Sequence, residues 1–144
     1  MTGTMTKAAL VVRRKIAASA EKLFDAWLDP ASLAEWMCPG DVQRSSAKTD
    51  PRIGGGFEII MHGKENLYLH TGIYRVIDRP RRLAFTWISE GTNQAETLVT
   101  IDFIAGRGTT EIVLTHERLP DDAAVRSHTA GWTRILELLA QTAA

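Results

Sequence analysis

The sequence predicts an α+β fold in which a curved antiparallel sheet of about six to seven strands wraps around a long C-terminal helix. Three observations indicate this fold. Apolar and polar residues alternate in successive segments between residues 57 and 117, as in strands with one buried face. Two short segments of helical spacing follow the first strand, and one long helical pattern occupies the C-terminal end. Because the sheet has a single apolar face, the long helix is the expected cover.

The N-terminal part begins with a strand and continues with two short helices. Residues 8–16 are rich in β-branched side chains, which favour a strand. Ser19 suits the N-cap of a first helix. That helix should end at Asp29-Pro30, because the residue before a proline avoids the α region. Pro30 can open a second helix with Trp36 on its apolar face.

The following strands are recognised by residues of alternating polarity between turn signals rich in Gly, Pro, Asn and Asp. Charged residues such as Glu58, Arg75 and Asp102 mark the solvent face. The residues predicted to face inward are Phe57, Ile59 and Met61; His70, Gly72, Tyr74 and Val76; Leu83, Phe85 and Trp87; Val99, Ile101 and Phe103; and Ile112, Leu114 and His116.

The last helix is predicted to run from the Pro120-Asp121-Asp122 break to about Ala140. Its apolar stripe carries His128 and Trp132, with Gly131 between them. A glycine inside a helix costs about 1 kcal/mol relative to alanine, so we expect a strand or a ligand to approach the backbone there. Because helix and strands both present His and Trp inward, we expect a hollow core that holds a ligand.

The chain contains no linker, repeat or low-complexity stretch, so we expect a single domain over residues 1–144, with residues 1–7 as a disordered tail. Composition indicates an ordinary globular protein. Hydrophobic residues make up 44% of the chain and charged residues 24%, which is typical of globular domains. The 17 basic and 17 acidic residues balance, so we expect neither nucleic acid nor a membrane as partner.

A cytoplasmic location is expected, because the chain has one cysteine, Cys38, and no secretory signal or apolar membrane-spanning run. The four histidines are His62, His70, His116 and His128. They lack the spacing of metal motifs, and one cysteine cannot build a thiolate site. We therefore predict no metal and no cofactor.

Several motifs along the chain resemble those of the START/SRPBCC superfamily, whose helix-grip fold is shared with the birch pollen allergen. Within it the chain is most similar to the branch of activators of heat-shock-protein ATPase homologues (AHSA-type). The motifs that carry the resemblance are Leu23-Phe24-Asp25-Ala26-Trp27, Asp50-Pro51-Arg52, Gly54-Gly55, Gly72-Ile73-Tyr74-Arg75-Val76, Pro80-Arg81-Arg82-Leu83, Phe85-Thr86-Trp87 and Gly131-Trp132. The resemblance implies a cavity for a small apolar or amphipathic molecule. It implies no single activity, since relatives include lipid carriers, hormone receptors and polyketide cyclases.

Three functions stay open, and binding of a small hydrophobic ligand is favoured over an enzyme. The candidate ligand-binding residues are Trp36, Phe57, Met61, Tyr74, Phe85, Trp87, Phe103, His116, His128 and Trp132. The second function is an enzyme of the cyclase or dehydratase kind with His116, His128 or Tyr74 as acid or base. The third is a stress-related interaction protein with a chaperone partner. A homodimer also stays open. For His116 and His128 a purely structural role also stays open. In that role they form hydrogen bonds within the fold and fix the helix against the sheet.

Overall fold

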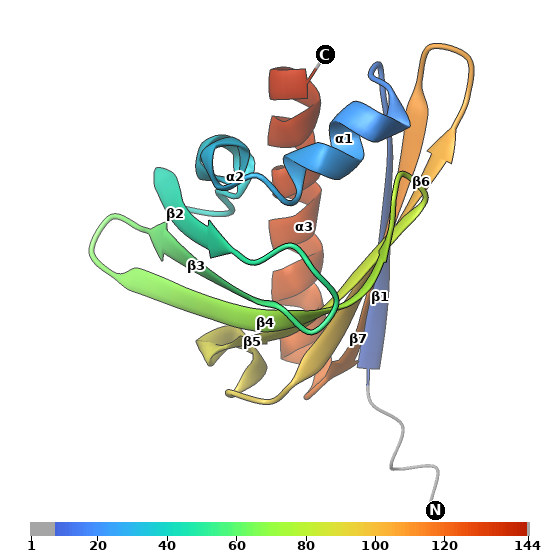
Figure 1. The fold of residues 1–144 in the computed structure, drawn as a ribbon. Helices are drawn as coiled ribbons and strands as arrows, with labels where there is room; N and C mark the ends of the chain where they lie inside the picture. Colours follow the sequence, from blue (N-terminus) through green and yellow to red (C-terminus); the bar gives the residue numbers. More distant parts are fainter. Residues whose placement is uncertain (1–7, 144) are drawn as a thin grey trace, which may run out of the picture.

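The computed structural model describes residues 8–143 and contains a seven-stranded antiparallel sheet, two short helices after the first strand, and a long C-terminal helix (Figure 1). The predicted helix-grip arrangement is confirmed, whereas the predicted tail at residues 1–7 lies outside the described residues. The elements are β1 (Ala8–Ile16), α1 (Ala20–Ala26), α2 (Pro30–Trp36), β2 (Arg44–Thr49), β3 (Gly56–His62), β4 (Leu67–Asp78), β5 (Arg82–Ser89), the 3-10 turn η2 (Glu90–Thr92), β6 (Thr97–Ala105), β7 (Thr110–Leu119) and α3 (Asp122–Ala143).

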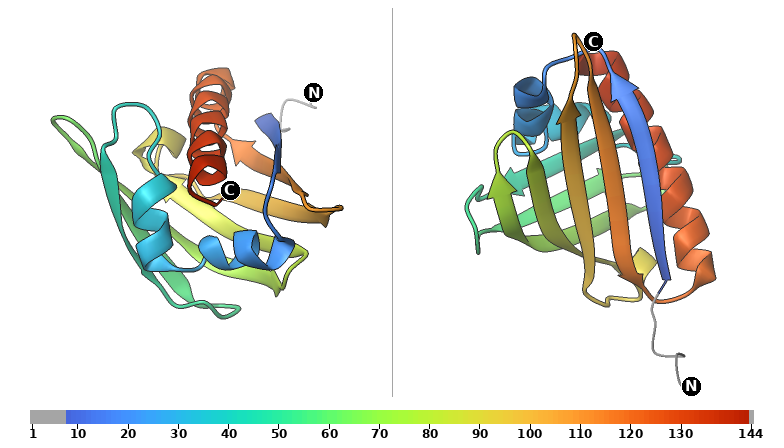
Figure 2. Two further views of the ribbon diagram at one scale, coloured as in Figure 1. Left: turned by 90° about the horizontal axis from the view of Figure 1, so that it is seen from above. Right: turned by 90° about the vertical axis from the view of Figure 1, so that its right-hand side faces the viewer.

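The sheet has the strand order β1-β7-β6-β5-β4-β3-β2, so β1 and β2 form its two edges. All neighbouring strands are antiparallel. Figure 2 shows the sheet curving around α3, which stands on its concave side. Helix α2 packs against both α3 and β2. This arrangement encloses the core and leaves one side of α3 to face β3 and β4.

The short helices begin where the sequence predicts. The Ser19 side chain caps α1 by accepting a hydrogen bond from the backbone N–H of Lys22 over 3.1 Å. The Asp29 carboxylate caps α2 by accepting from the N–H of Ala31 over 3.0 Å. Pro30 opens α2, where its missing N–H costs no hydrogen bond. These caps fix the two helices over one end of the sheet.

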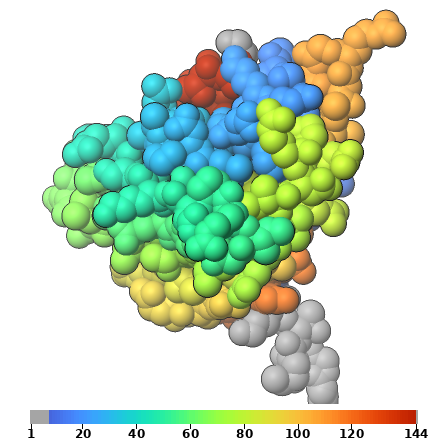
Figure 3. Space-filling model, viewed as in Figure 1, coloured from blue at the N-terminus to red at the C-terminus, as the bar shows by residue number. Residues whose placement is uncertain are grey.

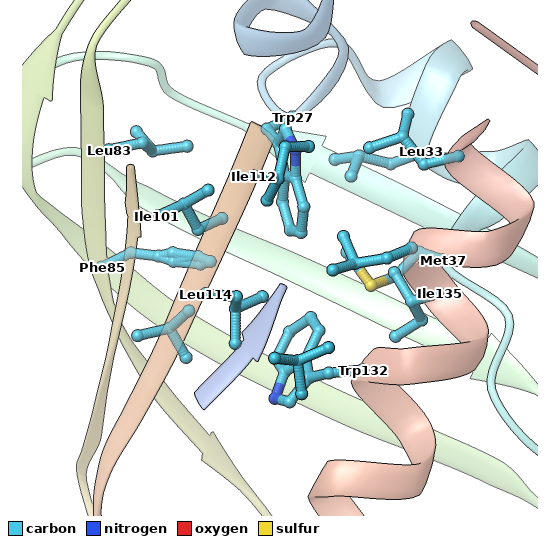
Figure 4. Packing of buried hydrophobic residues seen from close by; sticks show 14 of the residues in the cluster. Trp27, Leu33, Met37, Leu83, Phe85, Ile101, Ile112, Leu114, Trp132 and Ile135 are labelled. Carbon is cyan, nitrogen blue, oxygen red and sulfur yellow. The ribbon is translucent and has the colours of Figure 1, made fainter. Parts of the chain in front are cut away.

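The core lies between the concave face of the sheet and the helices. Figure 4 shows side chains of the helical side, such as Trp27, Met37 and Trp132, pointing toward Phe85 and Leu114 of the strands. On the face drawn in Figure 3, α1, α2 and residues 50–55 close over this core. The predicted alternation of buried residues is confirmed in β3, β6 and β7.

One inward-facing prediction is wrong. Val76 is 36% exposed, because the pairing of β4 with β5 shifts register between Tyr74 and Val76. The irregular pairing lies close to Gly72, where an added Cβ would collide with the carbonyl oxygen of Thr86 and with the ring of Phe57. A glycine is therefore required at this close approach of β4 and β5.

The described residues include no helix that combines the length and apolar character needed to cross a bilayer. Three arginines at the β4–β5 turn, Arg79, Arg81 and Arg82, are paired with carboxylates. Arg79 forms an ion pair with Asp25, and Arg82 with Asp102, at distances of 2.8 and 2.7 Å. The turn therefore presents a mixed-charge surface.

Candidate ligand-binding cleft

A cleft of about 750 Å³ lies between the middle of α3 and the strands β3, β4 and β5. Its remaining wall is formed by η2 and by the loop that follows α2, residues 39–42. Clefts of roughly 300–1,000 Å³ are the usual size of small-molecule sites. The cleft is present because α3 packs closely on β1 but stands away from β3 and β4.

The floor of the cleft is aromatic. The rings of Trp87 and Trp132 have centroids 5.0 Å apart and an interplanar angle of 54°. The imidazole of His70 lies against Trp87 at 4.7 Å and 36°. The thioether of Met61 adds an adaptable apolar contact. Such a floor can pack against a planar apolar group.

His116 is fully buried behind this floor and holds α3 to the sheet. The Trp132 indole N–H donates to His116 Nδ1 over 3.0 Å. Because Nδ1 accepts, Nε2 carries the proton and donates to Thr97 Oγ1 over 2.7 Å. The Thr97 hydroxyl in turn donates to the carbonyl of Trp87. This chain of hydrogen bonds joins α3 to β5, β6 and β7.

The protonation state of His116 follows from its surroundings. Burial, with a smaller contribution from the neighbouring His128, lowers the pKa of His116 to about 3. The two rings meet edge to face with centroids 4.9 Å apart. His116 is therefore neutral near pH 7, and both of its nitrogens are used within the fold.

His128 lines the cleft from α3. Its Nδ1 lies 2.8 Å from the carbonyl oxygen of Ala124. A carbonyl only accepts, so Nδ1 carries the proton and Nε2 is left as an acceptor. Burial lowers the pKa of His128, although the bond to Ala124 opposes this effect. The cleft therefore contains a neutral imidazole with a free acceptor.

His70 also lines the cleft, although it is not among the predicted ligand contacts. Its Nδ1 lies 3.2 Å from the carbonyl oxygen of Tyr68, which assigns the proton to Nδ1. Burial lowers the pKa of His70 to about 4, although the bond to Tyr68 opposes this effect. The sequence does carry a signal for this position, because His70 alternates in phase with Tyr74 on the same strand and is therefore predicted to face inward.

The predicted ligand contacts fall into two groups. Met61, Trp87, His128 and Trp132 lie together in the cleft. The others lie in the packed core around or behind it, and their contact with a ligand stays a prediction. These are Trp36, Phe57, Tyr74, Phe85, Phe103 and His116.

Part of this second group surrounds a small internal space. Phe57, Tyr74, Phe85 and Trp87 line a space of about 10 Å³, which is about the size needed by one water molecule. Burial raises the pKa of Tyr74 to about 12, so its hydroxyl keeps its proton. The deep core is therefore filled, and the open volume lies toward α3.

Trp36 and Phe103 lie in the packed core. The Trp36 ring meets Trp27 edge to face at 4.7 Å, and Phe103 packs on Phe24 at 5.3 Å. Among the described residues, the buried indole N–H groups of Trp27 and Trp87 find no acceptor. A polar group buried without a partner destabilises the fold by about 1–3 kcal/mol.

Gly131 lies on the cleft wall of α3. The sequence predicted a close approach to its backbone by a strand or a ligand. The nearest neighbour that an added Cβ would meet is Cβ of Pro39, at an ordinary contact distance of 3.5 Å. No strand among residues 8–143 needs this glycine, so the ligand alternative is the one left open.

Charged groups stand at the rim of the cleft. Asp41, Glu90 and Arg134 are exposed there, and Arg134 forms an ion pair with Glu137 over 3.0 Å. Within residues 8–143, no three His, Cys, Asp or Glu side chains come together as a metal site would need. The interior therefore offers aromatic surface and neutral imidazoles.

Comparison with known proteins agrees with this fold. The family model described as "Activator of Hsp90 ATPase homolog 1-like protein" matches residues 17–144. No curated protein matches the chain significantly.

Several solved structures share the fold. Protein CV1439 from Chromobacterium violaceum has a TM-score of 0.82 and 22% identity, covering 94% of this chain and 97% of its own. The HSP90 activator PFC0360w from Plasmodium falciparum has a TM-score of 0.73 and 22% identity, and the match covers 90% of this chain and 91% of the activator. CalU16 from Micromonospora echinospora has a TM-score of 0.70 and 22% identity, and the match covers 92% of this chain and 74% of CalU16. At such identities the likeness concerns the fold alone.

Proposed function

The chain belongs to the Activator of Hsp90 ATPase homolog 1-like family, and we propose that it binds a small apolar or amphipathic molecule in the cleft between the sheet and α3. The observation that carries the proposal is the cleft of about 750 Å³ with its floor of Trp87, Trp132 and His70. An apolar cleft with a few convergent polar groups is the usual form of a small-molecule site.

Gly131 supports the same proposal. In a helix this glycine costs about 1 kcal/mol relative to alanine, yet only Pro39 lies within contact distance of an added Cβ. Packing within the described residues does not explain the glycine. A ligand that lies against the α3 backbone would explain it, because any side chain at this position would take up part of its space.

Acid–base catalysis has less support than binding. His116 has both ring nitrogens engaged, and burial lowers its pKa to about 3. Burial also keeps the Tyr74 hydroxyl protonated by raising its pKa to about 12. An enzyme would therefore depend on His128 and His70, the two cleft imidazoles that remain able to take up a proton.

Chaperone activation is a second candidate, favoured by the family and by the fold shared with the HSP90 activator of Plasmodium falciparum. In that case the surface of the protein would carry the function. The test is the ATPase rate of an HSP90-type chaperone with and without the purified chain. Stimulation that persists when the cleft is filled would support the surface role.

The test of ligand binding compares the mass of freshly purified protein under native and denaturing conditions. A bound species that is lost on denaturation is expected, and its mass identifies the ligand. Gly131→Leu should abolish this species by filling the cleft. Thr133→Leu is the matched control, because it adds the same side chain to an exposed position of α3. Absence of any bound species, together with no binding of added hydrophobic compounds, would contradict the proposal.

A further inference from the structure

We propose that the cleft selects an uncharged, planar ring compound carrying a hydroxyl or N–H group, and that Nε2 of His128 accepts a hydrogen bond from that group. The inference rests on the proposed binding function and adds the chemistry by which the ligand would be recognised. It follows from the tautomers of two imidazoles, the shape of the floor and the placement of charge.

The tautomer of His128 is set by its own helix. Nδ1 lies 2.8 Å from the carbonyl oxygen of Ala124, one turn earlier in α3. Because that oxygen can only accept, the proton is on Nδ1, and Nε2 presents a lone pair. A ligand group that meets Nε2 must therefore donate the hydrogen bond.

The position of Nε2 is given by the opposite wall. A Cβ added to Gly91 of η2 would lie 3.5 Å from Nε2 and 3.2 Å from Cε1 of His128. Both Gly91 and His128 line the cleft. The acceptor edge of the imidazole thus faces η2, and any side chain at Gly91 would press on it.

His70 is the second imidazole that lines the cleft. Its Nδ1 lies 3.2 Å from the Tyr68 carbonyl oxygen, which leaves Nε2 without a proton. The charges of His70 and His128 would repel each other, which favours the neutral form of His70. Neither imidazole is therefore set up to offer a proton to an anionic ligand near neutral pH.

The ring shape follows from the aromatic floor. Trp87 and Trp132, with centroids 5.0 Å apart, line the cleft next to the two imidazoles. Both indoles are almost fully buried, so a ligand ring would extend this aromatic cluster at its accessible edge. Planar rings pack on such surfaces in tilted or offset arrangements. The charged side chains of the cleft, such as Arg134 and Glu90, are exposed at its rim. A buried charge on the ligand would lack a partner inside, so the ligand should be uncharged.

The experiment uses three probes on the full chain, measured by isothermal titration calorimetry. 2-Naphthol carries the ring and a donor, 2-methoxynaphthalene carries the ring without a donor, and 2-naphthoate carries an anion. We expect 2-naphthol to bind about three- to tenfold more tightly than the methyl ether, which is the net effect of one hydrogen bond. The anion should bind more weakly than 2-naphthol.

Two variants identify the acceptor. His128→Phe keeps a ring against His116 but removes the acceptor, so the preference for 2-naphthol should disappear while both neutral probes still bind. Gly91→Ala places a methyl group beside Nε2, which requires the ring to shift slightly, and should reduce the same preference while keeping the imidazole of His128. Thr133→Ala, on the outer side of α3, is the control and should keep the preference.

The outcomes separate this inference from the proposed function. Equal binding of 2-naphthol and its methyl ether would overturn the selection for a donor and leave the binding cleft intact. A preference that survives in His128→Phe would overturn the role of His128. Failure of all three probes would overturn the ring class, whereas the native mass measurement decides whether the cleft holds any ligand.

Discussion

The indole N–H of Trp132 donates to Nδ1 of His116 over 3.0 Å, and this bond joins the C-terminal helix to β7 inside the core. Each side chain is almost fully buried. The bond fixes the tautomer of His116 and orients the Trp132 ring that forms the cleft floor. It therefore links the stability of the fold to the geometry of the candidate site.

Replacing Trp132 by Phe should destabilise the protein more than replacing Trp87 by Phe. Both changes remove the same ring volume from buried positions. Trp132→Phe also leaves Nδ1 of His116 unpaired, whereas the N–H of Trp87 has no acceptor to lose. The difference in unfolding free energy should be about 1–3 kcal/mol, measured by urea denaturation. Equal losses would mean that the Trp132–His116 bond contributes nothing net.

Stability should fall as the solution becomes acidic. Burial lowers the pKa of His116 from its ordinary value of 6.5 to about 3. Between these values the unfolded chain binds a proton that the folded chain excludes, so the unfolding free energy decreases with decreasing pH. His70, whose pKa burial lowers to about 4, acts in the same direction. Above pH 6.5 the titration of these two histidines should no longer change the free energy of unfolding.

His116→Asn tests the source of this dependence. The amide does not titrate, and its oxygen can accept from Trp132. The variant will lose some stability at neutral pH because Thr97 loses its partner, but its unfolding free energy should vary less between pH 6.5 and acid. Urea denaturation across the pH range measures both slopes. An unchanged slope would assign the acid sensitivity to other groups.

Replacing Gly131 by Ala should stabilise the fold and weaken ligand binding. The new Cβ meets only Pro39 at 3.5 Å, so no strain is expected. The gain should be about 1 kcal/mol from helix propensity, visible as a higher melting temperature. The same methyl group takes space from the cleft, so the amount of copurified ligand should drop. A lower melting temperature would indicate that α3 is packed more tightly at this point than the distances suggest.

The sequence predicted the strands with one strongly apolar face but not β2. In this edge strand the inner positions are Ser45 and Ala47. Ser45 can be buried because its hydroxyl donates to the carbonyl of Met37 over 2.6 Å. That partner lies in a loop after α2, and no periodicity in residues 44–49 reveals it. Short polar strands are stabilised by such contacts, which appear only when the chain is folded.

The candidate site could be predicted only in part, because parity identifies the buried face and not the open volume. Phe57 and Met61 share the inward parity of β3. Yet Phe57 packs in the filled core, while Met61 reaches the cleft. The difference lies in how closely α3 covers each point of the sheet. That distance depends on the curvature of the strands, which the alternation pattern does not encode.

Replacing Gly72 by Ala should strongly destabilise the sheet at the bend of β4. The added Cβ would collide with the Thr86 carbonyl oxygen and the Phe57 ring, so backbone and core must both shift. Overpacking of this kind costs about 1–3 kcal/mol. Gly56→Ala is the matched control on the adjacent strand, because its Cβ would lie 3.6 Å from the carbonyl oxygen of Gly72, an ordinary contact. Urea denaturation should show a large loss for Gly72→Ala and little change for Gly56→Ala. Similar losses in both variants would show that the cost arises from glycine replacement in strands in general and not from the close approach at Thr86.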